Sequence, residues 1–213
     1  IAILTAMATG REVCYEDIYT EGITKITDVD FRYAEKLGTS IKLFGSSRID
    51  GDQVHAWVAP VMIGRDHVLY SVSDVFNGVM VKGNMVGTTM FYGRGAGKLP
   101  TASAVVADII AAVRHKDRNV AIGWSGERQT IAPMDTSSYR YFVRVDGNCE
   151  ENRNKAESVF GKAEFTVLDD LDEFAFVTEK MTEAAFKEKA AELDQACRAS
   201  GKKGILQMIR AEL

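Results

Sequence analysis

The residues from 136 to the end of the chain follow the order strand, helix, strand, strand, helix, strand. Alternating apolar side chains predict the strands over residues 137–146, 162–170, 173–180 and 204–213. Apolar residues at helical spacing predict helices over residues 151–161 and 182–201, and Thr182 can cap the second helix. A βαββαβ order of this length is typical of a ferredoxin-like unit.

The residues before this unit predict a separate region of helices and antiparallel strands. Residues 1–10 are in helical register, and residues 27–38 predict a helix in which Thr27 and Asp30 approximate a capping box. Strands are expected over residues 40–48, 53–62, 75–81 and 88–93, the first two joined at Asp50-Gly51. Residues 116–135 lack periodicity and are rich in glycine and polar side chains, which is typical of a linker.

The expected fold class is therefore α/β (α+β), with a mostly antiparallel sheet and helices followed by the ferredoxin-like unit. The expected boundaries are residues 1–115 for the first domain, 116–135 for the linker and 136–213 for the second domain. Because the formal net charge is −4 and no basic face is visible, we expect no nucleic-acid partner.

The composition also bears on membrane association, metal binding and cellular location. No apolar run reaches transmembrane length, so we expect no membrane association. The three histidines do not pair with another His or Cys at ligand spacing, so we expect no metal site. The chain has three cysteines, Cys14, Cys149 and Cys197, which are far apart and form no C-x-x-C motif. This odd number and spacing favour a reducing, cytoplasmic location.

A glycine-rich turn, FYGRGAGK, lies between an apolar run and a long amphipathic segment. Its glycines allow a backbone to approach a ligand closely, and a helix over Thr101–His115, capped by Thr101, would point N–H groups toward it. The spacing matches neither a Walker loop nor the dinucleotide fingerprint Gly-x-Gly-x-x-Gly. The turn therefore suits a phosphate, a dinucleotide or a tight contact between a helix and a sheet.

Several segments, in this order, resemble bacterial homoserine dehydrogenase. They are DIYTEGITKIT, YAEKLGTSIKLFG and VFNGVMVKGNMVGTTMFYGRGAGKLPTASAVVADI. The resemblance covers residues 1–115 closely, and the glycine loop with PTASAVVAD is its most specific part. The last domain resembles the ACT regulatory domain that many of these enzymes carry, mainly in the order of its elements.

The resemblance implies an oxidoreductase that interconverts L-aspartate semialdehyde and L-homoserine with NADP or NAD, in threonine and methionine biosynthesis. It places Gly95, Ala96 and Gly97 beside the cofactor, with a backbone contact from Gly97 near the nicotinamide. A purely structural turn is the alternative for these three residues. The helix Thr101–His115 is expected to pack against the nucleotide-binding domain.

The resemblance also implies that the chemical centre lies elsewhere in the enzyme. Its Rossmann domain, homoserine-binding carboxylates and general-acid lysine match no segment here, so no residue of this chain is expected to be catalytic. Because nothing caps the helix that starts at Ile1, the chain is interpreted as a fragment that is inactive alone.

In ACT domains an effector binds at the turn between the first strand and helix, which here implies Asp146 and Asn148. Glu151 stands where a glycine is expected, and its charge would repel the carboxylate of an amino acid. This favours a domain that forms a homodimer, or a degenerate regulatory domain, over a threonine sensor. The rival hypothesis is a non-enzymatic module that senses an amino acid or dimerises, and so regulates a partner dehydrogenase.

Overall fold

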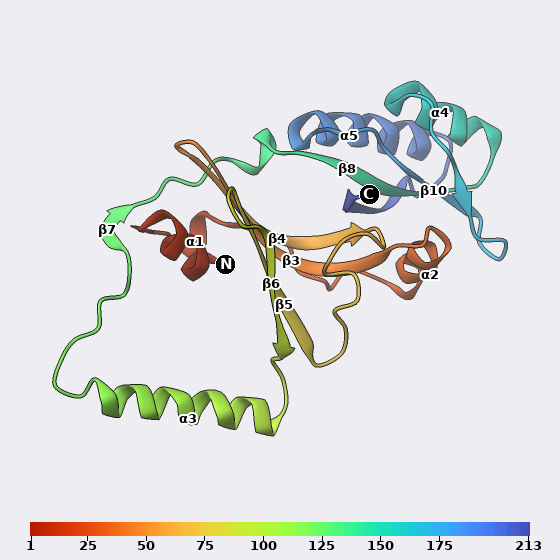
Figure 1. The fold of residues 1–213 in the computed structure, drawn as a ribbon. Helices are drawn as coiled ribbons and strands as arrows, with labels where there is room; N and C mark the ends of the chain where they lie inside the picture. Colours follow the sequence, from red (N-terminus) through yellow and green to blue (C-terminus); the bar gives the residue numbers. More distant parts are fainter. The chain divides into compact units, whose positions relative to one another are not determined.

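The computed structural model describes all 213 residues, from Ile1 to Leu213 (Figure 1). By their contacts the residues form two compact units, one of residues 1–64 and 124–213 and the other of residues 65–123. No helix is long and apolar enough to cross a membrane. The fold mixes helices with mostly antiparallel strand pairs, as expected.

The first unit is built on an eight-stranded sheet. Its elements before residue 65 are α1 (Ala2–Thr9), β1 (Arg11–Glu12), the 3-10 turn η1 (Tyr15–Asp17), β2 (Tyr19–Thr20), α2 (Asp28–Lys36), β3 (Ser40–Asp50) and β4 (Gln53–Ile63). Its elements after residue 123 are β7 (Ser125–Arg128), the 3-10 turn η2 (Met134–Thr136), β8 (Ser138–Asp146), α4 (Glu150–Phe160), β9 (Thr166–Val167), β10 (Glu173–Val177), β11 (Met181–Thr182), α5 (Glu183–Ala199) and β12 (Ile205–Glu212).

The last part of the chain has the predicted βαββαβ order. Its four main strands lie in the order β12-β8-β10-β9, and each neighbouring pair is antiparallel. The strand predicted over residues 162–170 is wrong in length, because only Thr166 and Val167 form ladder contacts with β10 at this edge of the sheet. The helices α4 and α5 lie over one face of these strands (Figure 1).

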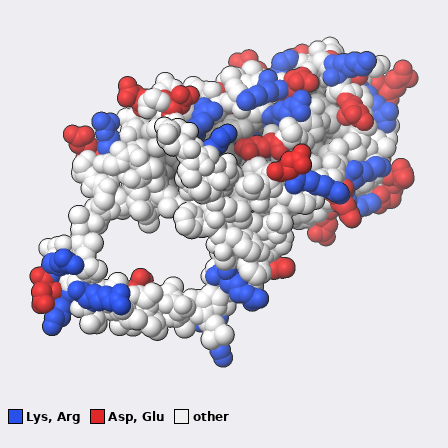
Figure 2. Space-filling model, viewed as in Figure 1, with Lys and Arg blue, Asp and Glu red and all other residues white.

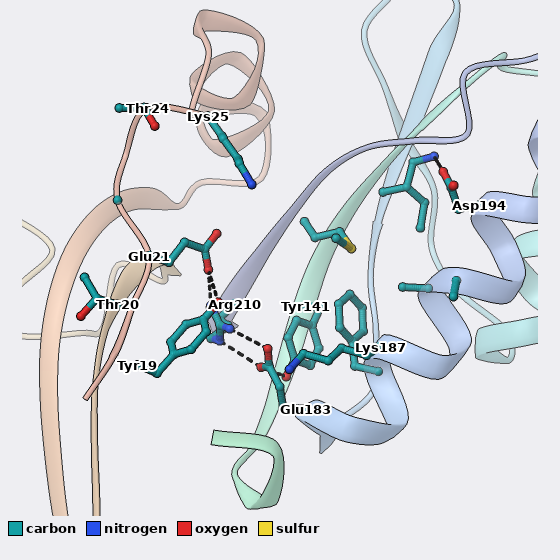
Figure 3. A pocket seen from close by; sticks show the side chains of 16 residues that line it. Tyr19, Thr20, Glu21, Thr24, Lys25, Tyr141, Glu183, Lys187, Asp194 and Arg210 are labelled. Atoms are coloured by element: carbon teal, nitrogen blue, oxygen red, sulfur yellow. Dashed lines mark hydrogen bonds and ion pairs between the residues drawn. The ribbon is translucent and has the colours of Figure 1, made fainter. Parts of the chain in front are cut away.

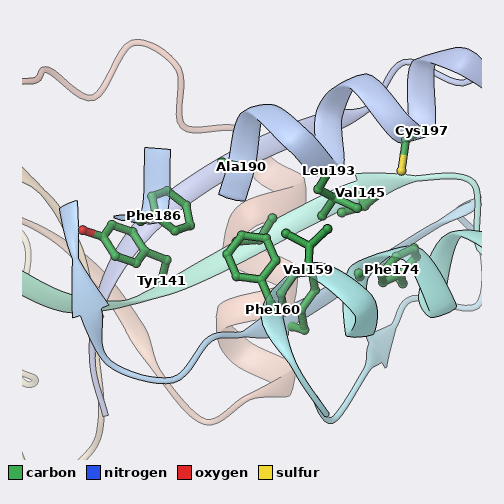
Figure 4. Packing of buried hydrophobic residues seen from close by; sticks show 12 residues of the cluster. Tyr141, Val145, Val159, Phe160, Phe174, Phe186, Ala190, Leu193 and Cys197 are labelled. Carbon is green, nitrogen blue, oxygen red and sulfur yellow. The ribbon is translucent and has the colours of Figure 1, made fainter. Parts of the chain in front are cut away.

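A hydrophobic core fills the space between this face and the two helices (Figure 4). The predicted alternation along β8 is confirmed, since Tyr141, Val143 and Val145 are all buried toward α4 and α5. From α5 the core receives the predicted apolar side chains, among them Leu193 and Cys197, which are both fully buried. Burial raises the pKa of the Cys197 thiol and keeps it protonated.

The opposite face of the sheet carries α2. Tyr33 of α2 packs against Phe142 of β8, with ring centroids 5.8 Å apart. The predicted capping box at the start of α2 is present, with Thr27 and Asp30 exchanging hydrogen bonds. Apolar side chains on both faces of β8 therefore hold the sheet between two layers of helix.

One feature that local patterns did not predict is the pairing of distant strands. β12 runs parallel to β4, with Arg210 opposite Val61, and β2 runs parallel to β4 near Trp57. Strands from both predicted domains therefore share one sheet. The segment 116–135, expected to be a linker, contains β7, which pairs in parallel with β1. The expected domain boundaries stay a prediction.

The second unit contains a hairpin of β5 (Phe76–Gly83) and β6 (Gly87–Arg94), followed by α3 (Lys98–Arg114). The hairpin was expected, but the predicted start of α3 is wrong. Gly97 is the N-cap, and Thr101 lies inside the helix, where its hydroxyl donates to the carbonyl oxygen of Gly97 at 2.9 Å. Pro100 is tolerated in the first turn, because a proline lacks only an N–H that would have no helical partner there.

Candidate functional site

The glycine loop connects β6 to α3 within the second unit. The N–H of Gly95 donates to the carbonyl oxygen of Val75 at 3.0 Å, and a Cβ at Gly95 would lie 1.7 Å from the side-chain nitrogen of Asn77. Gly97 has a φ of +112°, which side chains rarely tolerate. The backbone therefore favours glycine at position 97, and a side chain at position 95 would have to displace Asn77; Ala96 lies between them.

The start of α3 adds a favourable environment for an anion. The first N–H groups of a helix have no partner within it, and they lie at the positive end of the helix dipole. Lys98 adds a positive charge at the same point, directly after Gly97. The loop thus places Gly95, Ala96 and Gly97 directly before a helix start, where a negatively charged group would be favoured.

Apolar side chains are exposed along most of α3. Figure 2 shows that the charged side chains of this region gather mainly near the two ends of the helix. None of its residues is buried, although six are large and apolar, with exposed fractions of 45–75%: Leu99, Val105, Val106, Ile109, Ile110 and Val113. A patch of this kind marks an interaction surface in most proteins.

The two predicted effector residues lie in the turn between β8 and α4 of the first unit. The Asp146 carboxylate accepts the N–H of Lys203 at 2.8 Å. Gly147, with a φ of +82°, donates its N–H to the carbonyl of Asp172, and Asn148 donates its own to the Asp172 carboxylate at 2.8 Å. A ligand would therefore have to displace Asp172 to reach these N–H groups.

Glu151 lies at the start of α4, as the sequence suggests. Its carboxylate accepts a hydrogen bond from Lys155 at 2.6 Å and another from Ser200 at 3.0 Å. The hydrogen bond from Lys155 has the larger effect and that from Ser200 adds to it. Together they lower the pKa of Glu151 and keep its carboxylate charged. The negative charge expected from the sequence is thus present at this turn, although Lys155 partly balances it.

A buried ion cluster that the sequence did not reveal lies on the α5 face of the sheet. Arg210 of β12 binds Glu183 of α5 with two hydrogen bonds, at 3.1 and 2.7 Å, and binds Glu21 at 2.8 Å. Tyr141 donates its hydroxyl to Glu183 at 2.7 Å. The Arg210 guanidinium also lies over the ring of Tyr19, 5.0 Å from its centroid.

Burial and hydrogen bonds shift the pKa values of two members of this cluster, Arg210 and Tyr141. Burial by itself would lower the pKa of Arg210, but its hydrogen bonds to Glu21 and Glu183 outweigh this and raise the pKa. Burial, followed by the hydrogen bond to Glu183, raises the pKa of Tyr141 and keeps its hydroxyl protonated as a donor. The cluster ties the segment after β2 to α5 and β12.

A second buried ion cluster lies on the α2 face. Arg144 of β8 forms two hydrogen bonds of 3.0 Å with Glu173 and one of 2.5 Å with Asp30. Asp30 is the capping-box residue of α2, so one carboxylate serves both the helix start and the ion pair. Burial would lower the pKa of Arg144, but its hydrogen bonds to Glu173 and Asp30 raise it.

An open cavity of about 760 Å³ borders the Arg210 cluster (Figure 3). It lies between residues 19–25, α5 and β12, all in the first unit. Its charged lining has three acidic and three basic side chains: Glu21, Lys25, Glu183, Lys187, Asp194 and Arg210. Four segments that are distant in sequence form it, since Tyr141 of β8 also lines it, so no local motif pointed to it. The structure places no group of three or more His, Cys, Asp or Glu side chains where a metal ion could be held.

The sequence matches one protein family. The model of the family described as "Homoserine dehydrogenase" matches residues 1–110. The homoserine dehydrogenase of Neisseria gonorrhoeae is 41% identical over 158 residues, which are 70% of this chain and 36% of that protein. The homoserine dehydrogenase of Bacillus subtilis is 33% identical over 203 residues, which are 88% of this chain and 47% of that protein.

Solved structures extend the similarity to nearly the whole chain. The crystal structure of a homoserine dehydrogenase from Thiobacillus denitrificans is similar over 99% of this chain, with a TM-score of 0.81 and 29% identity. That of S. aureus homoserine dehydrogenase is similar over 99% of the chain, with a TM-score of 0.68 and 26% identity. The chain spans 51% of the length of each of these two structures.

Proposed function

Because the chain belongs to the homoserine dehydrogenase family, we propose that it is part of an enzyme that interconverts L-homoserine and L-aspartate semialdehyde with NADP or NAD. The observation that carries this proposal is the family match over residues 1–110, together with the structural similarity over 99% of the chain. The reaction would serve threonine and methionine biosynthesis in the cytoplasm.

In this proposal the second unit contacts the cofactor. NAD(P) supplies the hydride acceptor or donor, and the loop Gly95-Ala96-Gly97 holds it through backbone groups. Gly97 allows the closer approach, because the nearest atom to the position of a Cβ there is in Pro100, 3.7 Å away. The apolar surface of α3 packs against the nucleotide-binding domain. Its six exposed apolar side chains support this role, because such a surface is unfavourable in water.

The last domain is the ACT-type regulatory domain of the proposed enzyme. Its βαββαβ order and antiparallel strand order support this assignment. Asp146 and Asn148 are the proposed contacts of an amino-acid effector, and release of Asp172 from the turn is then the structural change that binding requires. The enzyme is proposed to be a homodimer, which the exposed apolar pair Val79 and Phe91 on the β5–β6 hairpin supports.

We expect these 213 residues, purified alone, to show no turnover of L-homoserine with NADP or NAD. Hydride transfer needs a bound nucleotide beside a proton donor, and the family resemblance assigns both to a domain that no segment here resembles. The measurement is the absorbance of reduced nucleotide, with the same protein lacking substrate as the blank. A rate above that blank would show that a catalytic centre exists within these residues.

A further inference from the structure

We propose that the cavity between residues 19–25 and α5 binds a small zwitterion, namely a free α-amino acid with an apolar side chain. This site is separate from the turn at Asp146 and Asn148. The binding does not depend on hydride transfer, so it can be tested independently of the proposed enzyme activity.

The charge of the lining favours a zwitterion. Three acidic and three basic side chains surround the cavity, so their formal charges cancel. A nucleotide or another multiply charged anion would gain little from such a lining, and so would a polycation. A ligand with one charge of each sign can place each beside its opposite.

At the cavity, one carboxylate oxygen and one ammonium group are free to bind a ligand. Glu21 uses one carboxylate oxygen for Arg210 and Tyr19, and the structure shows no partner for the other oxygen. The Lys25 ammonium has no partner in the structure, whereas the Lys187 ammonium binds Asp135 at 2.6 Å. Glu21 and Lys25 extend from the same segment toward β12 (Figure 3). They supply an acceptor for an ammonium group and a donor for a carboxylate.

The carboxylate of Glu21 is held in place before a ligand binds. Glu21 is fixed by Arg210, which is itself locked by two hydrogen bonds to the buried Glu183. A carboxylate that is already positioned loses little side-chain entropy when a ligand binds. The ammonium group of the ligand would therefore bind at Glu21, and Lys25 would close over its carboxylate.

The apolar part of the lining suits an apolar side chain of the ligand. Between the charged groups the cavity is bordered by Phe186, Ala190, Ala191, Ile205 and Met208. Met208 is 43% exposed, and its flexible side chain can adapt to different apolar groups. The volume of about 760 Å³ lies within the usual range of small-molecule sites, so an amino acid fits with some water.

The test is isothermal titration of the 213-residue chain with L-valine, L-threonine and L-methionine, supported by thermal shift. Isobutylamine and isovalerate, which are valine without its carboxylate and without its ammonium group, are the controls. We expect saturable binding of at least one amino acid and at least tenfold weaker binding of both controls, which corresponds to about 1.4 kcal/mol. No binding by either method, or equal binding of a control, would overturn the proposal.

Three variants locate the site. Lys25→Met removes the proposed carboxylate partner and is expected to weaken binding at least tenfold. Lys162→Met is the matched control, since Lys162 is exposed and lies outside the cavity. Asn148→Ala is expected to weaken any amino-acid binding at the β8–α4 turn but to leave the affinity of the cavity unchanged, because Asn148 does not line the cavity. If Asn148→Ala abolished binding and Lys25→Met did not, the ligand would bind at the turn and the proposal would be wrong.

Discussion

Replacing Arg144 with methionine is expected to lower the free energy of unfolding by about 3–5 kcal/mol, because it leaves two buried carboxylates without their partner. Asp30 is fully buried, and the side chain of Glu173 is only 9% exposed. Methionine keeps most of the volume of the arginine side chain. The loss of stability therefore comes from the unpaired buried charges and not from a cavity. The measurement is denaturant unfolding of the 213-residue chain, followed by far-UV circular dichroism.

The matched control for this variant is Arg32→Met. Arg32 forms an ion pair of 2.5 Å with Asp170, but both side chains are exposed, at 45% and 59%. Exposed pairs contribute less than about 1 kcal/mol, so this loss should be small. Adding Glu173→Gln to Arg144→Met should recover part of the stability, since it removes one of the unpaired charges. Equal losses for Arg144→Met and Arg32→Met would contradict the role given to the buried cluster.

Leu193→Ala is expected to cost about 2–5 kcal/mol, since it removes a fully buried side chain from the core between α5 and the sheet. The structure also predicts which regions unfold together in this variant. β12 and β4 share one sheet, so the last domain and residues 1–64 should unfold together. The variant should therefore shift the transition of the first unit as a whole.

Trp57 of β4 can report that shift. It is 3% exposed and contacts Tyr139 edge to face at 5.7 Å. In a Trp124→Phe background it is the sole tryptophan, so its fluorescence follows β4 alone. We expect Leu193→Ala to move the fluorescence and circular dichroism transitions by the same amount. A fluorescence transition that stayed in place would show that the two regions unfold independently.

Local patterns predicted most elements of this fold. The alternation of Tyr141, Val143 and Val145 identified β8 and its buried face, and helical spacing identified α5, because both signals depend on near neighbours in sequence. The parallel pairing of β4 with β12 joins residues far apart in sequence, which no periodicity reveals. For the same reason the sequence did not show that the two predicted domains share one sheet.

The candidate sites were predicted less completely. The glycine loop was visible because positive φ angles and close approach demand glycine, and Gly97 shows both the angle and the N-cap position. The buried ion clusters were missed, although a signal existed. Arg144 interrupts the apolar residues of a central strand, and a charge in such a position requires buried partners. Those partners, Asp30 and Glu173, lie too far away in sequence to be identified.

A chimaera tests whether these residues supply part of a homoserine dehydrogenase. In it they replace the matching part of the Neisseria gonorrhoeae enzyme, to which they are 41% identical over 158 residues. We expect the chimaera to oxidise L-homoserine with NADP or NAD, whereas the 213-residue chain alone does not. If the chimaera folds, as judged by circular dichroism and a cooperative thermal transition, yet shows no rate above that of the chain alone, the proposed function is wrong.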